Sequence, residues 1–420
     1  MSSPAGERPL TICAIGYATS IHVANRVRCF AARGHRVFLI TEVRSAEGID
    51  GVTELVPAPP QGRYARLLVR ALDWLSRKFT RIRADDVWRA VSFVSLVRQC
   101  RPDIVHVHYA YAYYAWLAGV LGCRPLVVSV MGGDVLYAEQ GNPSEVGIWL
   151  TKLVFRSADY ITSKSDFLTK ELDRLGGFGA KADRIVWGVD LAVFRRVDAT
   201  RLRHELRLTP GQTVILSPKI LQSFYRIELI IEAMVAVRRV VPDAVLLITE
   251  YNADPEYKGR LRALADSAGL SAAVRFCGHV ANADMASYYS LADVAIAVPP
   301  SDGLPQTLLE AMACETPNIL TRLDRYEEIV RDEESCLFTD ATPDAIAATI
   351  VRLLGDPALR DSIVRTGASI VRENADFWRQ VTQVETRYRA LAARIRPRTF
   401  RLQSVLFAAR HFRAARPTPK

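Results

Sequence analysis

The amino-acid sequence predicts an α/β protein with two Rossmann-like domains that face each other across a cleft. Short apolar runs alternate with amphipathic segments in strand–helix–strand order, which is typical of parallel βαβ units. The alternation occurs twice, because a charged stretch at residues 195–212, with the turn signal Thr209-Pro210-Gly211, separates two arrays. A length of 420 residues is also typical of two domains, each able to bury a core.

The expected elements follow from the apolar pattern along the chain. In the first array we expect strands at 10–15, 37–41, 104–108, 126–130, 160–163 and 184–187. We expect helices there at 23–33 and 145–158. In the second array we expect strands at 214–217, 244–249, 274–277 and 294–298, and helices at 227–240, 260–268 and 284–290. Open parallel sheets bind ligands at the carboxyl ends of their strands, so the loops after the strands are where function is expected.

The composition favours a folded protein with anionic partners. Half of the residues are hydrophobic and the formal net charge is +10, which favours phosphorylated small molecules, anionic lipid or nucleic acid. We expect no nucleic-acid partner, because the sequence has no recognition helix, zinc knuckle or stacking signature. The seven scattered cysteines indicate reduced thiols in a cytoplasmic protein. No apolar run reaches the length of a membrane span.

Residues 299–314 carry the strongest functional signal. They begin where an expected strand ends, and a helix is expected to start near Pro305, a residue suited to the first helical position. The unpaired amides of a helix start, together with Gly303, suit a pyrophosphate. Asp302 precedes this helix and Glu310 lies more than a turn inside it, so the two carboxylates are expected to bind sugar and ribose hydroxyls. A loop with an incidental Asp and a surface Glu is the alternative.

This segment resembles the signature of the retaining glycosyltransferases of family 4 (glycosyl transferases group 1), which have the GT-B fold. In that family an acidic residue, a Gly-rich turn and a Glu eight positions further on bind the donor. Asp302 stands where Glu is usual, and Pro305 stands where a second glycine is usual. The flanking residues also fit the family's order: Phe276-Cys277-Gly278-His279-Val280, Tyr288, Ala292-Asp293-Val294, Pro299, Pro317 and Glu328-Ile329-Val330.

The resemblance implies transfer of a hexosyl-type sugar from a nucleotide-diphosphate sugar with retention of the anomeric configuration. It implies no cofactor besides this donor substrate, and we expect no metal, because no Asp-x-Asp pair lies in a suitable loop. The donor-binding residues that it indicates are Gly16, Asp302, Gly303, Leu304, Pro305, Gln306, Thr307 and Glu310.

Without a metal, fixed cations have to stabilise the charge that develops on the leaving phosphate. Similar enzymes use an Arg or Lys pair after the first strand of the second domain. Lys219 and Arg226 lie in this region, although Tyr225-Arg226 replaces the usual Lys-Gly. We therefore expect Lys219, Arg226 and Asp134 to act in catalysis. An Arg226 on a helix surface and an Asp134 that caps the next helix are the alternatives.

Two loops of the first domain are expected on the acceptor side. The loop after the first strand ends at His22, for which a purely structural place at a helix start is equally compatible. The turn Met131-Gly132-Gly133-Asp134 resembles the family's His-Gly-x-Asp turn, with Met131 in place of His. The expected acceptor-side residues are His22, Gly132 and Gly133. His106 and His108 alternate on one strand, and packing is favoured there over metal binding.

The resemblance also divides the chain. It implies an acceptor domain at 1–200, a sugar-nucleotide domain at 201–375, a helix at 376–395 that crosses back to the first domain, and a basic tail at 396–420. Trp187, in the turn before the linker, is interpreted as structural.

Two basic segments suggest a membrane surface as a further partner. Residues 63–83 hold seven basic residues and one acid, and residues 389–420 hold nine basic residues and no acid, with large apolar side chains between them. Such segments suit an anionic bilayer. We expect peripheral attachment to the inner face of the membrane and a lipid-linked or glycan acceptor. A solvated surface or a protein docking site is the alternative.

Three functions are compatible with the sequence. The first is a glycosyltransferase of glycan, polysaccharide or glycolipid biosynthesis. The second is a sugar-nucleotide epimerase on the same fold, with Asp134 and Asp302 as acid and base. The third is a non-catalytic sugar-nucleotide sensor, which the replacements at Met131 and Asp302 and the displaced Arg226 would allow.

Overall fold

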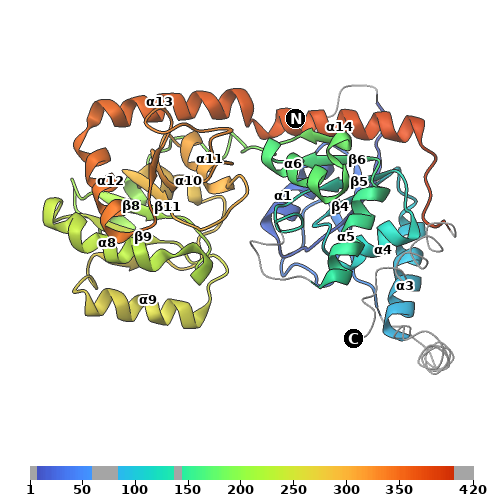
Figure 1. The fold of residues 1–420 in the computed structure, drawn as a ribbon, viewed down its shortest axis with the longest axis horizontal. Coiled ribbons are helices and arrows are strands. Elements are labelled where there is room, and N and C mark those ends of the chain that lie inside the picture. Colours follow the sequence, from blue (N-terminus) through green and yellow to red (C-terminus); the bar gives the residue numbers. More distant parts are fainter. Residues whose placement is uncertain (1–6, 59–83, 137–143, 402–420) are drawn as a thin grey trace. The chain divides into compact units, whose positions relative to one another are not determined.

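The computed structural model describes residues 7–58, 84–136 and 144–401, and it divides into two compact units (Figure 1). Unit 1 comprises Met1–Ile185 and Val381–Lys420, and unit 2 comprises Val186–Gln380. Each unit is a parallel sheet with helices packed against it, so the predicted α/β class with two Rossmann-like domains is confirmed.

Unit 1 contains a seven-stranded sheet in the order β3-β2-β1-β4-β5-β6-β7, in which every recorded pairing is parallel. Its strands are β1 (Thr11–Ile15), β2 (Arg36–Ile40), β3 (Val52–Leu55), β4 (Ile104–His108), β5 (Leu126–Ser129), β6 (Tyr160–Ser163) and β7 (Ala182–Arg184). Its helices are α1 (Ile21–Ala32), α3 (Ala84–Cys100), α4 (Tyr113–Leu121), α5 (Glu145–Ser157), α6 (Asp166–Gly176) and the short η1 (Gly179–Lys181). The strand order reverses between β1 and β4.

Unit 2 contains a six-stranded parallel sheet in the order β10-β9-β8-β11-β12-β13. Its strands are β8 (Val214–Ser217), β9 (Val245–Ile248), β10 (Val274–Phe276), β11 (Val294–Ala297), β12 (Asn318–Thr321) and β13 (Leu337–Thr339). Its helices are α7 (Thr200–Glu205), η2 (Ser223–Tyr225), α8 (Ile227–Val240), α9 (Pro255–Ser267), α10 (Met285–Leu291), α11 (Gln306–Ala313), α12 (Pro343–Gly355) and α13 (Pro357–Asn374). Here the order reverses between β8 and β11.

Both faces of the unit 2 sheet are covered, which explains why its strands are apolar throughout. On β8, Val214 and Leu216 pack into one hydrophobic cluster, whereas Ile215 packs into the cluster on the opposite face. Successive side chains of a strand point to opposite faces, so a strand buried on both sides reads as a continuous apolar run.

Helix starts in unit 2 carry the residues that such positions favour. Asp254 accepts hydrogen bonds from the first-turn amides of α9, and Thr342 accepts from Ala345 at the start of α12. A proline follows each of these caps, and its fixed φ suits the first helical residue.

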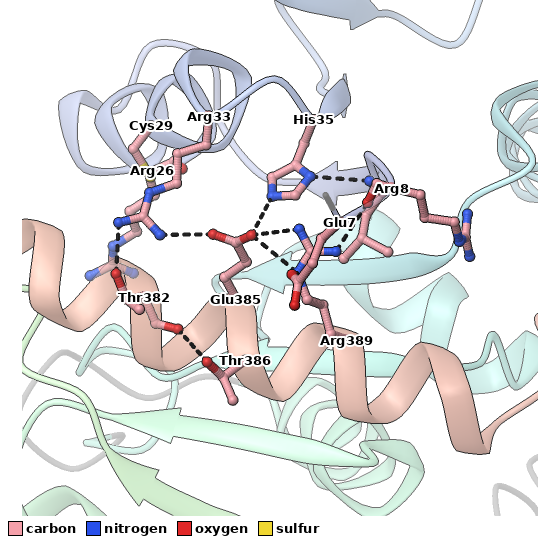
Figure 2. A network of polar contacts seen from close by, with 11 residues as sticks. Glu7, Arg8, Arg26, Cys29, Arg33, His35, Thr382, Glu385, Thr386 and Arg389 are labelled. Atoms are coloured by element: carbon pink, nitrogen blue, oxygen red, sulfur yellow. Dashed lines mark hydrogen bonds and ion pairs between the residues drawn. The ribbon is translucent and has the colours of Figure 1, made fainter. Parts of the chain in front are cut away.

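The last helix, α14 (Phe377–Arg394), begins in unit 2 and continues into unit 1. A polar network holds it to unit 1 (Figure 2). Glu385 Oε2 lies 2.7 Å from Arg33 Nη1, Glu385 Oε1 lies 2.8 Å from Arg389 Nη2, and His35 Nε2 lies 3.1 Å from Oε1. The Glu385 side chain is only 4% exposed, so Arg33 and Arg389 neutralise a buried charge.

Two sequence-based boundaries differ from the structure. The domain boundary was expected at residue 200, but unit 2 begins at Val186, because Val186, Val189 and Phe194 belong to a core cluster of that unit. The strand expected at 184–187 is β7, which ends at Arg184; Trp187 instead adopts a left-handed backbone with φ 65° and is buried. The basic segment 63–83 lies outside the described residues, as does most of the tail, from residue 402.

Within the described residues, no helix has the length and apolarity that crossing a membrane requires.

Candidate functional site

The loops at the strand-order reversal of unit 2 hold the strongest site candidates. Lys219 follows β8, and Asp302 lies in the loop that follows β11. The two strands are parallel neighbours, so their carboxyl ends bring these loops together. A reversal of strand order at the carboxyl edge is the usual ligand position in open α/β sheets.

Lys219 and Asp302 form an ion pair, with Nζ 2.5 Å from Oδ2. The Lys219 side chain is 8% exposed and that of Asp302 is 20% exposed. The Tyr225 ring lies 5.4 Å from Nζ, which places an aromatic face beside the ammonium. The predicted cation and the predicted carboxylate of this site are therefore in direct contact.

Glu310 is buried in α11, and its Oε2 accepts a hydrogen bond from the Tyr289 hydroxyl at 3.0 Å. Burial raises the pKa of Glu310 to about 7, while the Tyr289 hydroxyl and the Lys219 charge act in the opposite direction. The surface position that was the alternative for Glu310 is thus excluded. The Glu310 carboxyl, with a pKa near neutral pH, therefore interacts electrostatically with Lys219.

The amino end of α11 follows the loop of Asp302. Pro305 was expected at the first helical position but occupies the cap, with φ −73° and ψ 129°, because its backbone is still extended. The amides of Gln306 and Thr307 find no acceptor in the described part of the chain, as is usual for the first turn of a helix. Gly303 has no positive φ, and an added Cβ would meet no described atom within 4 Å.

Two other predicted donor residues have structural contacts. Leu304 is buried in a hydrophobic cluster of unit 2. The Gln306 side-chain amide donates to the backbone carbonyl of Gly188, which ties the start of α11 to the first residues of unit 2.

Arg226 stands between η2 and α8, where its left-handed backbone (φ 51°, ψ 41°) ends one helix and starts the other. Its side chain is half-buried and makes no hydrogen bond or ion pair within the described residues. No described residue therefore competes with a ligand for the guanidinium donors.

Sequence reasoning missed several residues around this site. Tyr225 contacts Lys219, and Tyr289 contacts Glu310. The buried Tyr326 lies beside Asp302. Burial raises the pKa of the Tyr326 phenol, and the charge of Asp302 raises it further. Tyr289 and Tyr326 are distant from their partners in sequence. Tyr225 follows Lys219 closely, but a tyrosine at any of these positions gives no signal beyond core packing.

In unit 1, the loop after β1 packs closely on its neighbours. A Cβ on Gly16 would lie 3.2 Å from Val23 Cγ1 and 3.3 Å from His108 Cβ, so glycine is needed for α1 to approach the sheet here. His22 lies in the first turn of α1 and is half-buried. Gly16 therefore has a packing role that is independent of any ligand.

Asp134 fixes the turn after β5 rather than capping a helix. Its Oδ1 accepts from the amides of Met131 and Gly132, both at 3.0 Å, and its Oδ2 accepts from Ala110 at 3.2 Å. Gly132 has φ +115°, which favours glycine. Burial raises the pKa of Asp134, and the backbone amides oppose this shift. Asp134 thus joins two loops, with the half-buried Gly133 between it and Gly132.

Arg26 is a further residue that sequence reasoning missed. It lies one turn after His22 on α1, is buried, and its Nη1 contacts Met131 Sδ at 2.8 Å. Burial lowers its pKa to about 10. The i, i+4 spacing from His22 was the available signal.

The two strand histidines are packing residues, as expected. His106 Nε2 lies 2.8 Å from Ser129 Oγ, and its Nδ1 meets the Tyr388 hydroxyl of α14. Among the described residues, no group of three or more His, Cys, Asp or Glu side chains could hold a metal ion.

Comparison with known proteins agrees with this arrangement. Residues 198–369 match the family model described as glycosyl transferases group 1, and residues 19–193 match that of glycosyltransferase family 4. N-acetyl-alpha-D-glucosaminyl L-malate synthase of Bacillus anthracis is 25% identical over 68% of this chain and 74% of its own length. D-inositol 3-phosphate glycosyltransferase of Acidothermus cellulolyticus is 29% identical over 63% of this chain and 62% of its own length.

Among solved structures, Anabaena Alr3699/HepE in complex with UDP-glucose is similar in fold, with a TM-score of 0.74 and 16% identity. The match covers 91% of this chain and all of that chain. The two family models account for most of the sequence, and each unit has the doubly wound parallel sheet of the GT-B fold. This chain therefore belongs to glycosyltransferase family 4 and is a glycosyltransferase.

Proposed function

We propose that this enzyme transfers a sugar from a nucleoside-diphosphate sugar to an acceptor, without a metal and with retention of the anomeric configuration. The observation that carries the proposal is the cluster of Lys219, Asp302, the amino end of α11 and Glu310 at the strand-order reversal of unit 2. This cluster supplies, side by side, the groups that a phosphate, a sugar and a ribose require.

The diphosphate binds at Lys219 and at the first amides of α11. A buried ammonium and unpaired helix amides act together on an anion, because the helix end adds a partial positive charge. Arg226 is the second cation of the same loop. Its side chain has no ion-pair or hydrogen-bond partner among the described residues, which supports this role. The solved structure of Alr3699/HepE with UDP-glucose adds support for a nucleotide-sugar ligand.

Asp302 and Glu310 bind the hydroxyls on either side of the diphosphate. Asp302 holds the Lys219 ammonium in the structure, and an incoming phosphate would share this cation with it. The carboxylate then accepts from sugar hydroxyls. Glu310 accepts from the ribose hydroxyls, with Tyr289 fixing the orientation of its carboxyl group.

The transfer step follows from this placement. The bond between the anomeric carbon and the leaving phosphate oxygen breaks, and the acceptor oxygen forms its bond on the same face. The acceptor proton passes to the leaving phosphate. Lys219 and Arg226 stabilise the charge that develops on that phosphate, a contribution of about 3 kcal/mol for one such donor.

The acceptor binds in unit 1, at the loops of His22 and of Gly132 to Asp134. Arg26, which follows His22 on α1 and contacts Met131, favours an anionic acceptor. Two relatives are named for L-malate and for inositol 3-phosphate, which are small anions. We therefore prefer a small anionic acceptor over a lipid-linked or glycan acceptor at the inner membrane face. The membrane acceptor is supported only by the basic segments, residues 63–83 and the tail at 396–420.

A thermal-shift screen against nucleotide sugars tests the donor, since a ligand that binds only the folded protein raises its melting temperature. The best donor is then incubated with inositol 3-phosphate, malate or a lipid acceptor, and the anomeric proton of the product is read by NMR. Retention of configuration supports the proposal. An epimerised sugar nucleotide without acceptor, or binding without turnover across all acceptors, would contradict it.

A further inference from the structure

Unit 1 contains a cavity of about 590 Å³ that is separate from the candidate acceptor loops. It lies at the amino ends of β5, β6 and β7. Of its lining residues, Asp159 and Lys181 come directly before β6 and β7, and Arg124 lies two positions before β5. The loops of His22 and Asp134 lie at the carboxyl edge of the same sheet. The two places are on opposite edges, and the cavity volume is typical of a small-molecule site.

The lining of this cavity is strongly basic. It holds one carboxylate, Asp159, and five cationic side chains: Arg124, Arg156, Lys181, Arg398 and Arg401. Asp159 is already engaged, because it pairs with the Arg124 guanidinium and its Oδ2 accepts from the amide of Leu126 at 2.9 Å. The lining as a whole therefore carries more positive than negative charge.

Defined contacts hold these cations in place. Lys181 Nζ donates to the carbonyls of Arg156 and Ala158 at 2.8 and 2.9 Å. The ammonium thereby stabilises the carboxyl end of α5, which carries a partial negative charge, and keeps one hydrogen for a further acceptor. Arg398 and Arg124 exchange backbone hydrogen bonds of 2.8 and 2.7 Å, and the amide of Arg401 donates to Leu121. The segment after α14 is thus fixed as one wall of the cavity.

The positive charges of these side chains repel one another in the folded protein. Burial lowers the pKa of Lys181, and the neighbouring Arg124 and Arg156 lower it further against the pull of Asp159. Burial likewise lowers the pKa of Arg398, together with Arg401 and Arg124. A bound anion would relieve this repulsion.

We propose that this cavity is a second anion site of the enzyme, which binds a phosphate group at the amino edge of the unit 1 sheet. Convergent guanidinium groups suit phosphate oxygens because they donate in a fixed, bidentate geometry. The phosphate belongs either to a soluble phosphorylated molecule or to the headgroup of an anionic lipid. The proposal does not depend on the donor site in unit 2.

Protection of Lys181 from acetylation tests this site, with inorganic pyrophosphate as the soluble probe and mass spectrometry as the readout. Well above the dissociation constant, pyrophosphate is expected to slow acetylation of Lys181 by about tenfold. The exposed Lys170 of α6 is the internal reference and keeps its rate. Vesicles of phosphatidylglycerol and of phosphatidylcholine form the second arm, and protection by the former alone identifies a lipid headgroup.

Matched variants locate the effect. Arg156→Gln combined with Arg401→Gln should weaken protection by about tenfold or more, because each charged hydrogen bond contributes strongly. Arg28→Gln with Arg98→Gln removes the same charge from exposed positions outside the cavity and should change nothing. Lys219→Ala should also leave protection intact, which separates this site from the donor site. Unprotected Lys181 with both probes, or full protection in the cavity variant, overturns the proposal.

Discussion

Lys219 is the residue on which the proposed chemistry depends most. We expect Lys219→Ala to lower kcat by about a hundredfold or more, because one fixed donor to the leaving phosphate is lost. The substitution also leaves the partly buried Asp302 without its ion-pair partner, so the melting temperature should fall. Adding Asp302→Asn should recover the melting temperature but not kcat. Wild-type kcat in the folded Lys219→Ala variant would remove Lys219 from the mechanism.

Glu310 should make donor binding depend on pH. Its pKa of about 7 means that the carboxyl is largely protonated at pH 6 and ionised at pH 8, and only the ionised form accepts fully from ribose. Donor affinity should therefore rise by roughly tenfold or less over this range. Calorimetric titration at both pH values measures it, and Glu310→Gln should flatten the dependence. The same slope in Glu310→Gln would assign the titration to another group.

The raised pKa of Glu310 has the opposite effect on stability. The folded protein holds the proton between the ordinary pKa of 4.5 and about 7, whereas the unfolded chain loses it. The contribution of this residue to folding therefore decreases as pH rises through that window. As pH rises, ionisation of Glu310 therefore strengthens donor binding and weakens the stability of the fold.

At the scale of elements, α14 depends on the buried carboxylate of Glu385. Its partners come from the residues directly after α1 and from α14 itself (Figure 2). Glu385→Gln leaves Arg33 buried without a counter-charge, so unit 1 should lose about 3 kcal/mol of stability. Hydrogen exchange of α14 amides should accelerate, while Thr386→Ala, an exposed neighbour, should change little. Unchanged exchange in Glu385→Gln would show that α14 is held by apolar packing alone.

The elements that the sequence predicted best are those with the clearest burial. β8 and β11 are buried along their whole length and were expected to within one residue. β3 was not expected, because it is a half-exposed edge strand that carries Glu54. Pro305 was placed one position too far into α11, since a proline fits both the cap and the first turn.

At the scale of the whole molecule, buried histidines predict sensitivity to acid. Burial lowers the pKa of His35 and His108, and lowers that of His106 to about 3. The folded protein therefore binds fewer protons than the unfolded chain below the ordinary pKa of 6.5. The lowered pKa of Glu385 acts in the same direction below 4.5. Stability present above pH 6.5 is thus lost as pH falls.

Melting temperatures at pH 7.5, 6 and 5 measure this effect. We expect a progressive decrease from pH 7.5 to pH 5. Because Glu310 acts in the opposite direction over this range, the Glu310→Gln variant is measured beside the wild type. An equal melting temperature at all three pH values in that variant would mean that these histidines are not buried as neutral groups in solution.

The sequence predicted the positions of the site better than its contacts. Lys219 and Glu310 could be found because the sequence resembles the family's pattern at both places, after β8 and within α11. The contact of Lys219 with Asp302, and that of Glu310 with Tyr289, depend on the strand order of unit 2, which brings distant segments together. Asp134 was expected near a ligand, but its three amide partners become visible only in the folded loops.

The affinity of the enzyme for the nucleoside diphosphate of its best donor tests the central claim most directly. Calorimetry should give dissociation constants about tenfold or more higher for Lys219→Ala and for Glu310→Ala than for the wild type, because one ligand touches both residues. The double variant should bind weakest. Wild-type affinity in both folded single variants would contradict the account and place the nucleotide elsewhere.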